Sequence, residues 1–162
     1  MMLSDKFNVI EMLEMAKEIE DRGYRLYSTH AKEMDDPKLK KIFNKLASDE
    51  KDHYNTFDKL EKEYKDKEQK DYSYLERVEV NDYLQSLVQF EVFPKGESQE
   101  LKGMGTLEVL DRAIQSEKDS ILLYRELIPY NEDKTKEVLE RLIEEEKEHY
   151  VSLVNYRKEI VN

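Results

Sequence analysis

The chain has 162 residues, a length that suits one domain with a single hydrophobic core. It contains no cysteine, which excludes disulfides, thiolate metal sites, iron–sulfur clusters and thiol nucleophiles, so a bound metal must be held by nitrogen and oxygen. The net charge of −11 disfavours nucleic acid and anionic membranes as partners, because both bind to basic surfaces.

The beginning of the sequence carries no sign of export. Residues 1–6 lack the basic region and apolar run of a signal peptide, and no stretch approaches the roughly 20 apolar residues that cross a bilayer. We therefore expect no membrane partner and, by default, a cytoplasmic location.

The spacing of apolar residues predicts an all-α protein. These residues recur about every 3.5 positions along most of the chain, and only 4 Gly and 3 Pro interrupt them. Pro37 suits the first turn of a helix, and Thr106 is the predicted N-cap of a later one. Four long helices are predicted, over about residues 5–33, 37–65, 106–128 and 133–160.

The segment between the second and third predicted helices is long. It covers about residues 66–105 and is expected to hold a short helix near residues 81–90. Such a length suits a crossover that lets the third helix run parallel to the second, as in ferritin-like bundles, rather than a tight turn. We therefore predict one ferritin-like four-helix domain over residues 1–162.

The two halves of the chain repeat one pattern of inward-facing residues. The first predicted helix has Leu13, Ala16, Glu20, Gly23 and Tyr27, and the third has Leu110, Ala113, Glu117, Ser120 and Tyr124, 97 positions later throughout. The second and fourth helices match at an offset of 96, where Glu50 and His53 recur as Glu146 and His149. The repeat therefore places ionisable residues on faces that should be buried.

Six residues of this repeat are candidate metal ligands, namely Glu20, Glu50, His53, Glu117, Glu146 and His149. A buried carboxylate costs several kcal/mol unless something compensates its charge, and four together also repel one another. Each glutamate is about 15 residues, or roughly 22 Å, from the turn that ends its helix pair, so the side chains can converge in one layer. A metal-free polar layer that fixes helix register is the alternative, but its charge cost disfavours it.

The spacing Glu-x-x-His places a carboxylate and an imidazole on one helical face, so both can reach one metal cluster. Four carboxylates balance the charge of two divalent ions, and oxygen donors with one imidazole per metal suit iron or manganese better than structural zinc. This ligand set is the known pattern of ferritin-like di-iron and di-manganese proteins. We expect two iron ions, although manganese could replace them.

With Glu20 and Tyr27, the run Glu50-Lys51-Asp52-His53, and their second copies, the chain resembles the rubrerythrin-like branch of the ferritin-like superfamily. The resemblance covers the four long helices but not the crossover. It implies that Glu50 and Glu146 bridge two irons, while Glu20 with His53 and Glu117 with His149 complete the individual irons. It also implies reduction of peroxide or dioxygen, or oxidation of ferrous iron.

The sequence departs from the family at three points. A chain without cysteine has no rubredoxin iron–cysteine domain, so electrons would come from an external donor protein or from ferrous iron itself. Rubrerythrins carry an extra glutamate one turn before the third-helix ligand, and Ile114 stands there, which weakens the peroxidase assignment. Bacterioferritins, which have similar ligands, bind haem through a methionine where this chain has Lys51, so haem is not expected.

Several residues near the six candidates have two interpretations. Tyr27 and Tyr124 lie two turns beyond Glu20 and Glu117 on the same helical faces. They are either hydrogen-bond donors to the carboxylates or ordinary aromatic residues of the core. His30 has no ligand spacing and is expected near the surface at the turn, and the run Glu144-Glu145 is expected to flank the site or face solvent.

The leading hypothesis is a rubrerythrin-like di-iron oxidoreductase that reduces peroxide or dioxygen. The alternative is a ferroxidase that stores or detoxifies iron, and a non-enzymatic interaction bundle is third. A homo-oligomer is compatible with each of them.

Overall fold

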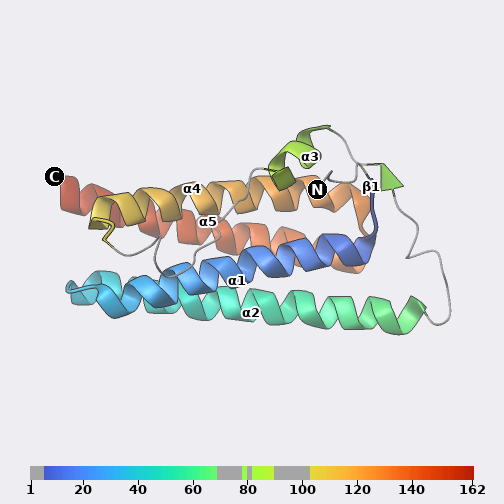
Figure 1. Ribbon diagram of the computed structural model, residues 1–162, viewed down its shortest axis with the longest axis horizontal. Coiled ribbons are helices and arrows are strands. Elements are labelled where there is room, and N and C mark those ends of the chain that lie inside the picture. The colour runs from blue at the N-terminus through green and yellow to red at the C-terminus, as the bar shows by residue number, and fades with distance from the viewer. Residues whose placement is uncertain (1–5, 69–77, 80–81, 90–102) are drawn as a thin grey trace.

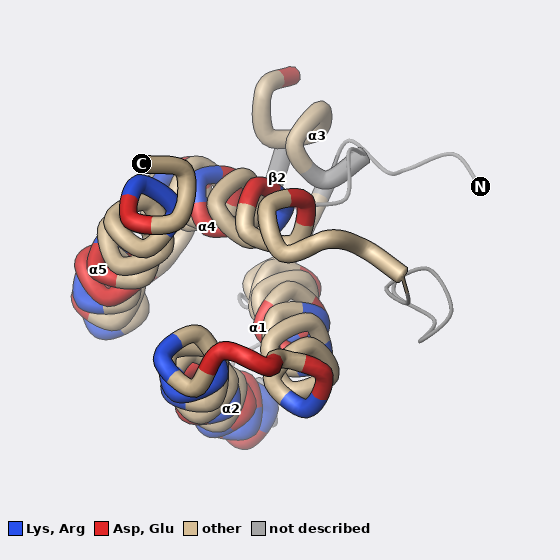
Figure 2. Tube along the Cα trace, turned by 90° about the vertical axis from the view of Figure 1, so that its left-hand side faces the viewer, with Lys and Arg blue, Asp and Glu red and all other residues tan. Residues whose placement is uncertain are grey.

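The computed structural model describes residues 6–68, 78–79, 82–89 and 103–162. Figure 2, which looks along the molecule, shows α1 beside α2 and α4 beside α5. The long helices of this bundle are α1 (Val9–Glu33), α2 (Pro37–Glu68), α4 (Thr106–Leu127) and α5 (Asp133–Val161). The structure thus confirms the predicted all-α four-helix bundle.

The order and direction of the helices fit a crossover connection. Figure 1 shows that α1 and α2 run antiparallel, that α4 and α5 do so too, and that α4 runs parallel to α2. A short helix, α3 (Asp82–Gln89), lies outside the bundle against α4 and matches the helix expected near residues 81–90. The rest of the predicted crossover, at residues 69–77, 80–81 and 90–102, lies outside the described residues.

The first helix begins four residues later than predicted. Asn8 accepts a hydrogen bond from the Glu11 backbone nitrogen at 2.8 Å, and Glu11 accepts one from the Asn8 backbone nitrogen at 3.3 Å. This capping box satisfies backbone donors at the N-terminus and fixes the start of α1. Just before it, β1 (Lys6–Phe7) pairs antiparallel with β2 (Val78–Glu79).

The other helix ends lie within a few residues of their expected positions. α2 continues three residues beyond the predicted end, and α4 is followed by the 3₁₀ turn η2 (Ile128–Tyr130). The predicted N-cap of α4 is wrong, because Gly105 occupies that position without a side-chain hydrogen bond and Thr106 is the first helical residue. The assignment of all 162 residues to one domain stays a prediction.

The core runs along the bundle between the two helix pairs. Each fully buried Leu or Phe contributes about 1.5–3 kcal/mol relative to an exposed one. The largest side chains with almost no exposure are Tyr27, Tyr124, Phe43, Phe57, Met12, Leu26, Leu39, Leu84, Leu110, Leu123 and Leu127. They come from α1, α2, α3 and α4, and Leu139, Leu142 and Leu153 of α5 are at most 1% exposed as well, so the inward stripes read from the sequence do face one another.

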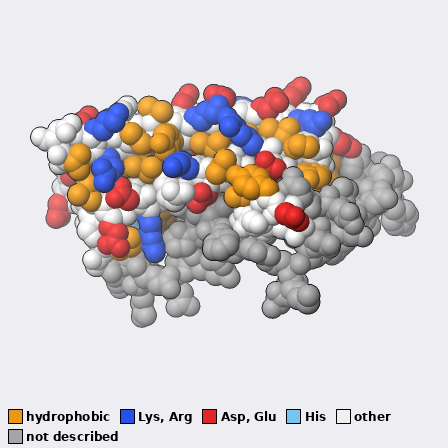
Figure 3. Space-filling model, turned by 90° about the horizontal axis from the view of Figure 1, so that it is seen from above, with side chains coloured by type: hydrophobic (Ala, Val, Ile, Leu, Met, Phe, Trp, Pro, Cys, Tyr) orange, Lys and Arg blue, Asp and Glu red, His pale blue; other side chains and the backbone are white. Residues whose placement is uncertain are grey.

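One face of the described residues is mixed in character. Seen from above α4 and α5, hydrophobic side chains lie among Lys, Arg, Asp and Glu, and no single sign of charge dominates the part of this face that is described (Figure 3). Among the described helices, none has the length and apolar content needed to cross a bilayer.

Candidate metal centre

Six buried ionisable side chains meet in the middle of the bundle. They are Glu20 on α1, Glu50 and His53 on α2, Glu117 on α4, and Glu146 and His149 on α5. Each is between 0% and 4% exposed. The structure therefore brings together all six residues that the sequence analysis selected as metal ligands.

Their donor atoms form two overlapping groups, and within each group the atoms lie within 4.8 Å of one another. The first group is Glu20, Glu50, His53 and Glu146, and the second is Glu50, Glu117, Glu146 and His149. The groups share Glu50 and Glu146, to which the family resemblance assigns the bridging role. The arrangement thus offers two adjacent metal positions with two carboxylates common to both.

The two histidines direct the same ring nitrogen toward the centre. His53 Nδ1 lies 2.8 Å from Glu146 Oε1 and 3.4 Å from Glu20 Oε2. His149 Nδ1 lies 3.3 Å from oxygens of both Glu50 and Glu146. The imidazole rings stack with centroids 5.7 Å apart, so they stand side by side over the shared carboxylates.

Each of the six residues keeps one buried atom without a directed hydrogen bond. Even the close approach of His53 Nδ1 to Glu146 Oε1 lacks hydrogen-bond geometry. The atoms are Glu20 Oε2, Glu50 Oε1, His53 Nδ1, Glu117 Oε2, Glu146 Oε1 and His149 Nδ1. Because buried polar atoms are rarely left unpaired, six orphans around one point indicate a missing common partner. The residues therefore fit a pair of cations.

Electrostatics in the metal-free cluster lead to the same conclusion. Burial, with the charge of Glu146 added, raises the pKa of Glu50 and of Glu117 well above the usual range. Burial alone would lower the pKa of His53 and His149, but the surrounding carboxylates outweigh it and raise both pKa values. Without a cation, the cluster therefore holds protons that metal ions would displace.

A second carboxylate orients each histidine from outside the cluster. His53 Nε2 lies 2.7 Å from Glu145 Oε2, and His149 Nε2 lies 3.0 Å from Asp49 Oδ2. Such contacts fix the ring orientation and leave Nδ1 directed at the metal. The pairs cross between helices, since the α5 carboxylate holds the α2 histidine and the α2 carboxylate holds the α5 histidine.

The sequence analysis missed these two carboxylates. Glu145 was expected only to flank the site or face solvent, and Asp49 was not singled out. Both come directly before a cluster glutamate and match at the same offset of 96. The repeat extends one turn further, because Lys45 lies 2.6 Å from Asp49 and Arg141 lies 3.7 Å from Glu145. The extended repeat was the signal that could have revealed them.

Tyr27 and Tyr124 fill both of the roles expected for them. The Tyr27 hydroxyl donates to Glu117 Oε1, and the Tyr124 hydroxyl donates to Glu20 Oε1. The rings also pack in the core, with Tyr27 5.3 Å from Phe43 between centroids. Each tyrosine therefore occupies one oxygen of a carboxylate and leaves the other oxygen to face the centre.

The prediction for His30 was wrong. The side chain is 2% exposed rather than near the surface, and its Nε2 atom has no hydrogen-bond partner. It lies on the inward face of α1, three residues beyond Tyr27. Burial lowers the pKa of the imidazole, Glu33 opposes this and Arg112 adds to it. His30 remains separate from the six-residue cluster, as expected.

Comparisons with known proteins agree with this geometry. A family model described as rubrerythrin matches residues 2–61, which include Glu20, Glu50 and His53. A solved structure described as a ferritin-like diiron-carboxylate protein from Thermotoga maritima is 28% identical, with a TM-score of 0.75 over 95% of this chain and 97% of that one. The search of curated proteins finds no match. Together with the bundle, the order of its helices and the six-residue cluster, these likenesses support a ferritin-like protein that is similar to rubrerythrin.

Proposed function

We propose that the protein is a di-iron carboxylate oxidoreductase that reduces peroxide or dioxygen with electrons from an external donor. The observation that supports it best is the set of six orphaned donor atoms around one buried point. Four carboxylates and two imidazoles match the charge and the donor preference of two ferrous ions. Manganese is compatible with the same donors, and metal analysis decides between the two.

Glu20 with His53 would hold one iron and Glu117 with His149 the other, with Glu50 and Glu146 shared. When bound, the iron pair would supply one electron from each ion to the oxidant and would then be reduced again. Reduction of hydrogen peroxide to two water molecules consumes two electrons and two protons.

The protein's own residues prepare this chemistry. The six ligands are at most 4% exposed, so bulk water is kept from the reacting atoms. Tyr27 and Tyr124 hold Glu117 and Glu20 by hydrogen bonds, which positions the oxygen left for metal. The 162 residues contain no cysteine for a rubredoxin-type iron, so the electrons come from outside them.

The choice between oxidants is open to a direct comparison. Ile114 stands where the family carries an extra glutamate, and it packs partly buried against the core. An apolar side chain offers no further carboxylate, which favours dioxygen over peroxide as the faster oxidant. Anaerobic stopped-flow mixing of the iron-loaded protein with each oxidant measures the two rates.

Metal content tests the site itself. The unaltered protein, loaded anaerobically with ferrous iron and desalted, should retain two irons per chain, and Glu50→Ala or Glu146→Ala should retain fewer than about one. Iron retention that both substitutions leave unchanged would end the di-iron assignment. If iron is retained but neither oxidant oxidises it faster than free ferrous ion, the oxidoreductase proposal fails and metal binding stands.

Iron storage is the alternative, and the mass of the protein in solution separates it. Storage needs a closed shell of many subunits around the mineral, whereas a redox enzyme works as a monomer or a small oligomer. Light scattering after addition of excess ferrous iron and air should show a small particle without a retained mineral. A many-subunit shell that retains iron would overturn the proposal.

A further inference from the structure

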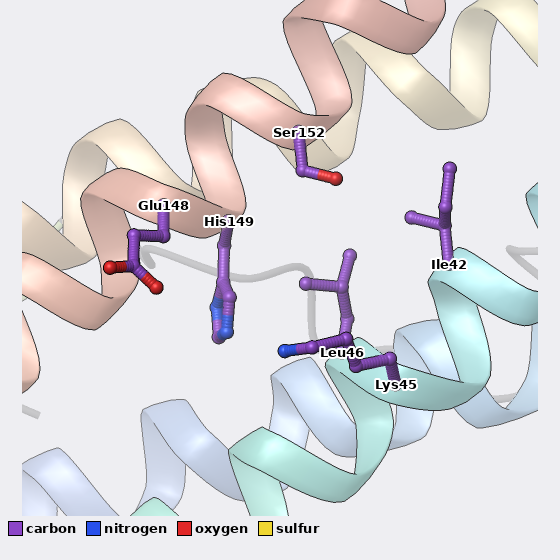
Figure 4. A pocket seen from close by; sticks show the side chains of 6 residues that line it. All are labelled: Ile42, Lys45, Leu46, Glu148, His149 and Ser152. Atoms are coloured by element: carbon purple, nitrogen blue, oxygen red, sulfur yellow. The ribbon is translucent and has the colours of Figure 1, made fainter.

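A cavity lies between α2 and α5 beside the metal centre. It has a volume of about 230 Å³, room for several waters at about 30 Å³ each. Figure 4 shows its wall: His149 and Ser152 come from α5, and Leu46 and Lys45 from α2. The lining residues are Ile42, Lys45, Leu46, Glu148, His149 and Ser152.

The cavity reaches the metal centre at His149, the most exposed of the six cluster residues. His149 is 4% exposed, against 0–2% for the other five cluster residues, and it alone among the six lines the cavity. Its ring has the cluster on the Nδ1 side and Asp49 on the Nε2 side. A species in the cavity therefore lies beside the imidazole ring whose Nδ1 atom faces the carboxylates.

The cavity wall suits a hydrated cation. Ser152 presents a hydroxyl and Glu148 a carboxylate, both of which can replace water around a metal ion. Lys45 is the one cation in the lining, and Asp49 offsets its charge at 2.6 Å. The chain's net charge of −11 also attracts cations toward the surface.

We propose that divalent metal ions reach the buried centre through the α2–α5 cavity, with the Lys45–Asp49 pair at its rim. The inference rests on the proposed di-iron function and concerns how the ions arrive. A hydrated ion loses water at high cost, so it needs a polar route, whereas a small neutral oxidant can cross apolar packing without one. The oxygen donors of Glu148 and Ser152, which lie beside His149 in this wall, thus favour the cation as the occupant.

The test measures how fast cobalt(II) binds, because its visible absorption reports binding without any reaction with oxygen. Ser152→Trp places a large side chain in the cavity from an exposed position on α5. Its matched control is Thr56→Trp, the repeat position 96 residues earlier, which lies partly exposed on α2 and outside the cavity lining. Stopped-flow absorbance gives the rates, and equilibrium titration gives the amount of cobalt bound.

We expect Ser152→Trp to slow cobalt uptake at least about tenfold. Thr56→Trp should change the rate by less than about twofold, and both variants should bind the same final amount of cobalt as the unaltered chain. Equal rates in all three proteins, or equal slowing by both tryptophans, would overturn the route. Absence of cobalt binding by the unaltered chain would overturn the di-iron function as well, so the two failures are distinguishable.

A second variant tests the charge at the rim without placing a larger side chain in the cavity. Lys45 is 72% exposed, so Lys45→Ala should fold normally. Removing its charge leaves Asp49 free to attract the incoming ion, and uptake should become about twofold to tenfold faster at low salt, with the gain lost at high salt. The matching Arg141→Ala, at the repeat position beside Glu145, should leave the rate unchanged. Equal acceleration by the two variants would argue against this cavity.

Discussion

His53 of α2 is held by Glu145 of α5, with Nε2 and Oε2 2.7 Å apart. The partner relationship, Asp49 of α2 with His149 of α5, has the same crossed form at 3.0 Å. Both carboxylates act through the histidine rather than on the metal position, since each contacts the cluster at a histidine Nε2 atom. Their effect should therefore appear in affinity rather than in the number of metal ions bound.

Glu145→Ala and Asp49→Ala should each weaken metal binding by about 10–100-fold while two ions are still bound at saturation. The cause is loss of the contact that fixes the imidazole. Competition with a chelator measures the affinity. Glu144→Ala is the control, because that carboxylate is exposed and pairs with Lys147. An effect from Glu144→Ala as large as from Glu145→Ala would contradict the orienting role.

The number of ions bound should depend on which glutamate is removed. Glu20→Ala should leave about one ion per chain, because Glu20 belongs to only one of the two donor groups. Glu50→Ala should lose more of the bound metal, because both donor groups include Glu50. Metal analysis after desalting gives both numbers. Equal metal content in the two variants would refute the shared role of Glu50.

Metal affinity should increase with pH. The pKa values of Glu50, Glu117, His53 and His149 are all raised, so the metal-free cluster holds protons at neutral pH. Metal binding releases these protons, and raising the pH makes their release easier. Calorimetry in two buffers with different ionisation enthalpies counts the protons. No release at pH 7, with an affinity independent of pH, would refute this account.

Tyr27→Phe should lower the free energy of unfolding of the metal-free protein by about 1–3 kcal/mol. The hydroxyl donates to buried Glu117, and its removal leaves that oxygen unpaired, while the ring still packs on Phe43. Tyr124→Phe should have a similar effect through Glu20. Urea unfolding measures both variants. Unchanged stability in both would show that these hydrogen bonds contribute little.

Buried His30 should make the fold less stable in acid. Its folded-state pKa is lowered below 6.5, so it favours the neutral form, and the unfolded chain takes up the proton first. This contribution to stability is present above about pH 6.5 and is lost as the pH falls toward the folded-state pKa. Urea unfolding of the metal-free protein gives the free energy of unfolding at pH 7.5 and at pH 5.5. The difference between these two values should be smaller for His30→Phe than for the unaltered protein. The same difference between the two pH values in both proteins would mean that His30 does not titrate in this range.

The six cluster residues could be found from sequence because they break a simple rule. A buried glutamate such as Glu20 or Glu50 in an apolar stripe needs a cation to compensate its charge. The repeat shows that such glutamates occur in both halves of the chain. The helices followed from apolar periodicity for a similar reason, since their buried faces are long and regular. A pattern that both halves share is less open to chance than either half alone.

The features that were missed depend on neighbours that the helical period does not reveal. Asp49 and Glu145 precede ligands by one residue, so they lie about 100° around the helix and look like surface residues. Only the position of the antiparallel partner helix turns them toward a histidine. His30 was misplaced because a lone histidine near a turn gives no sign of its depth. The start of α1 depends on the capping box at Asn8, which lies ahead of the apolar pattern.

The crossed contacts have a consequence for how such a centre can be assembled. A single helical hairpin, α1 with α2, carries a glutamate, a Glu-x-x-His pair and an outer carboxylate, but its own outer carboxylate reaches the other hairpin's histidine. Two copies of one hairpin, related by a two-fold axis, would complete each other in full. The geometry is therefore that of a symmetric dimer of hairpins joined into one chain.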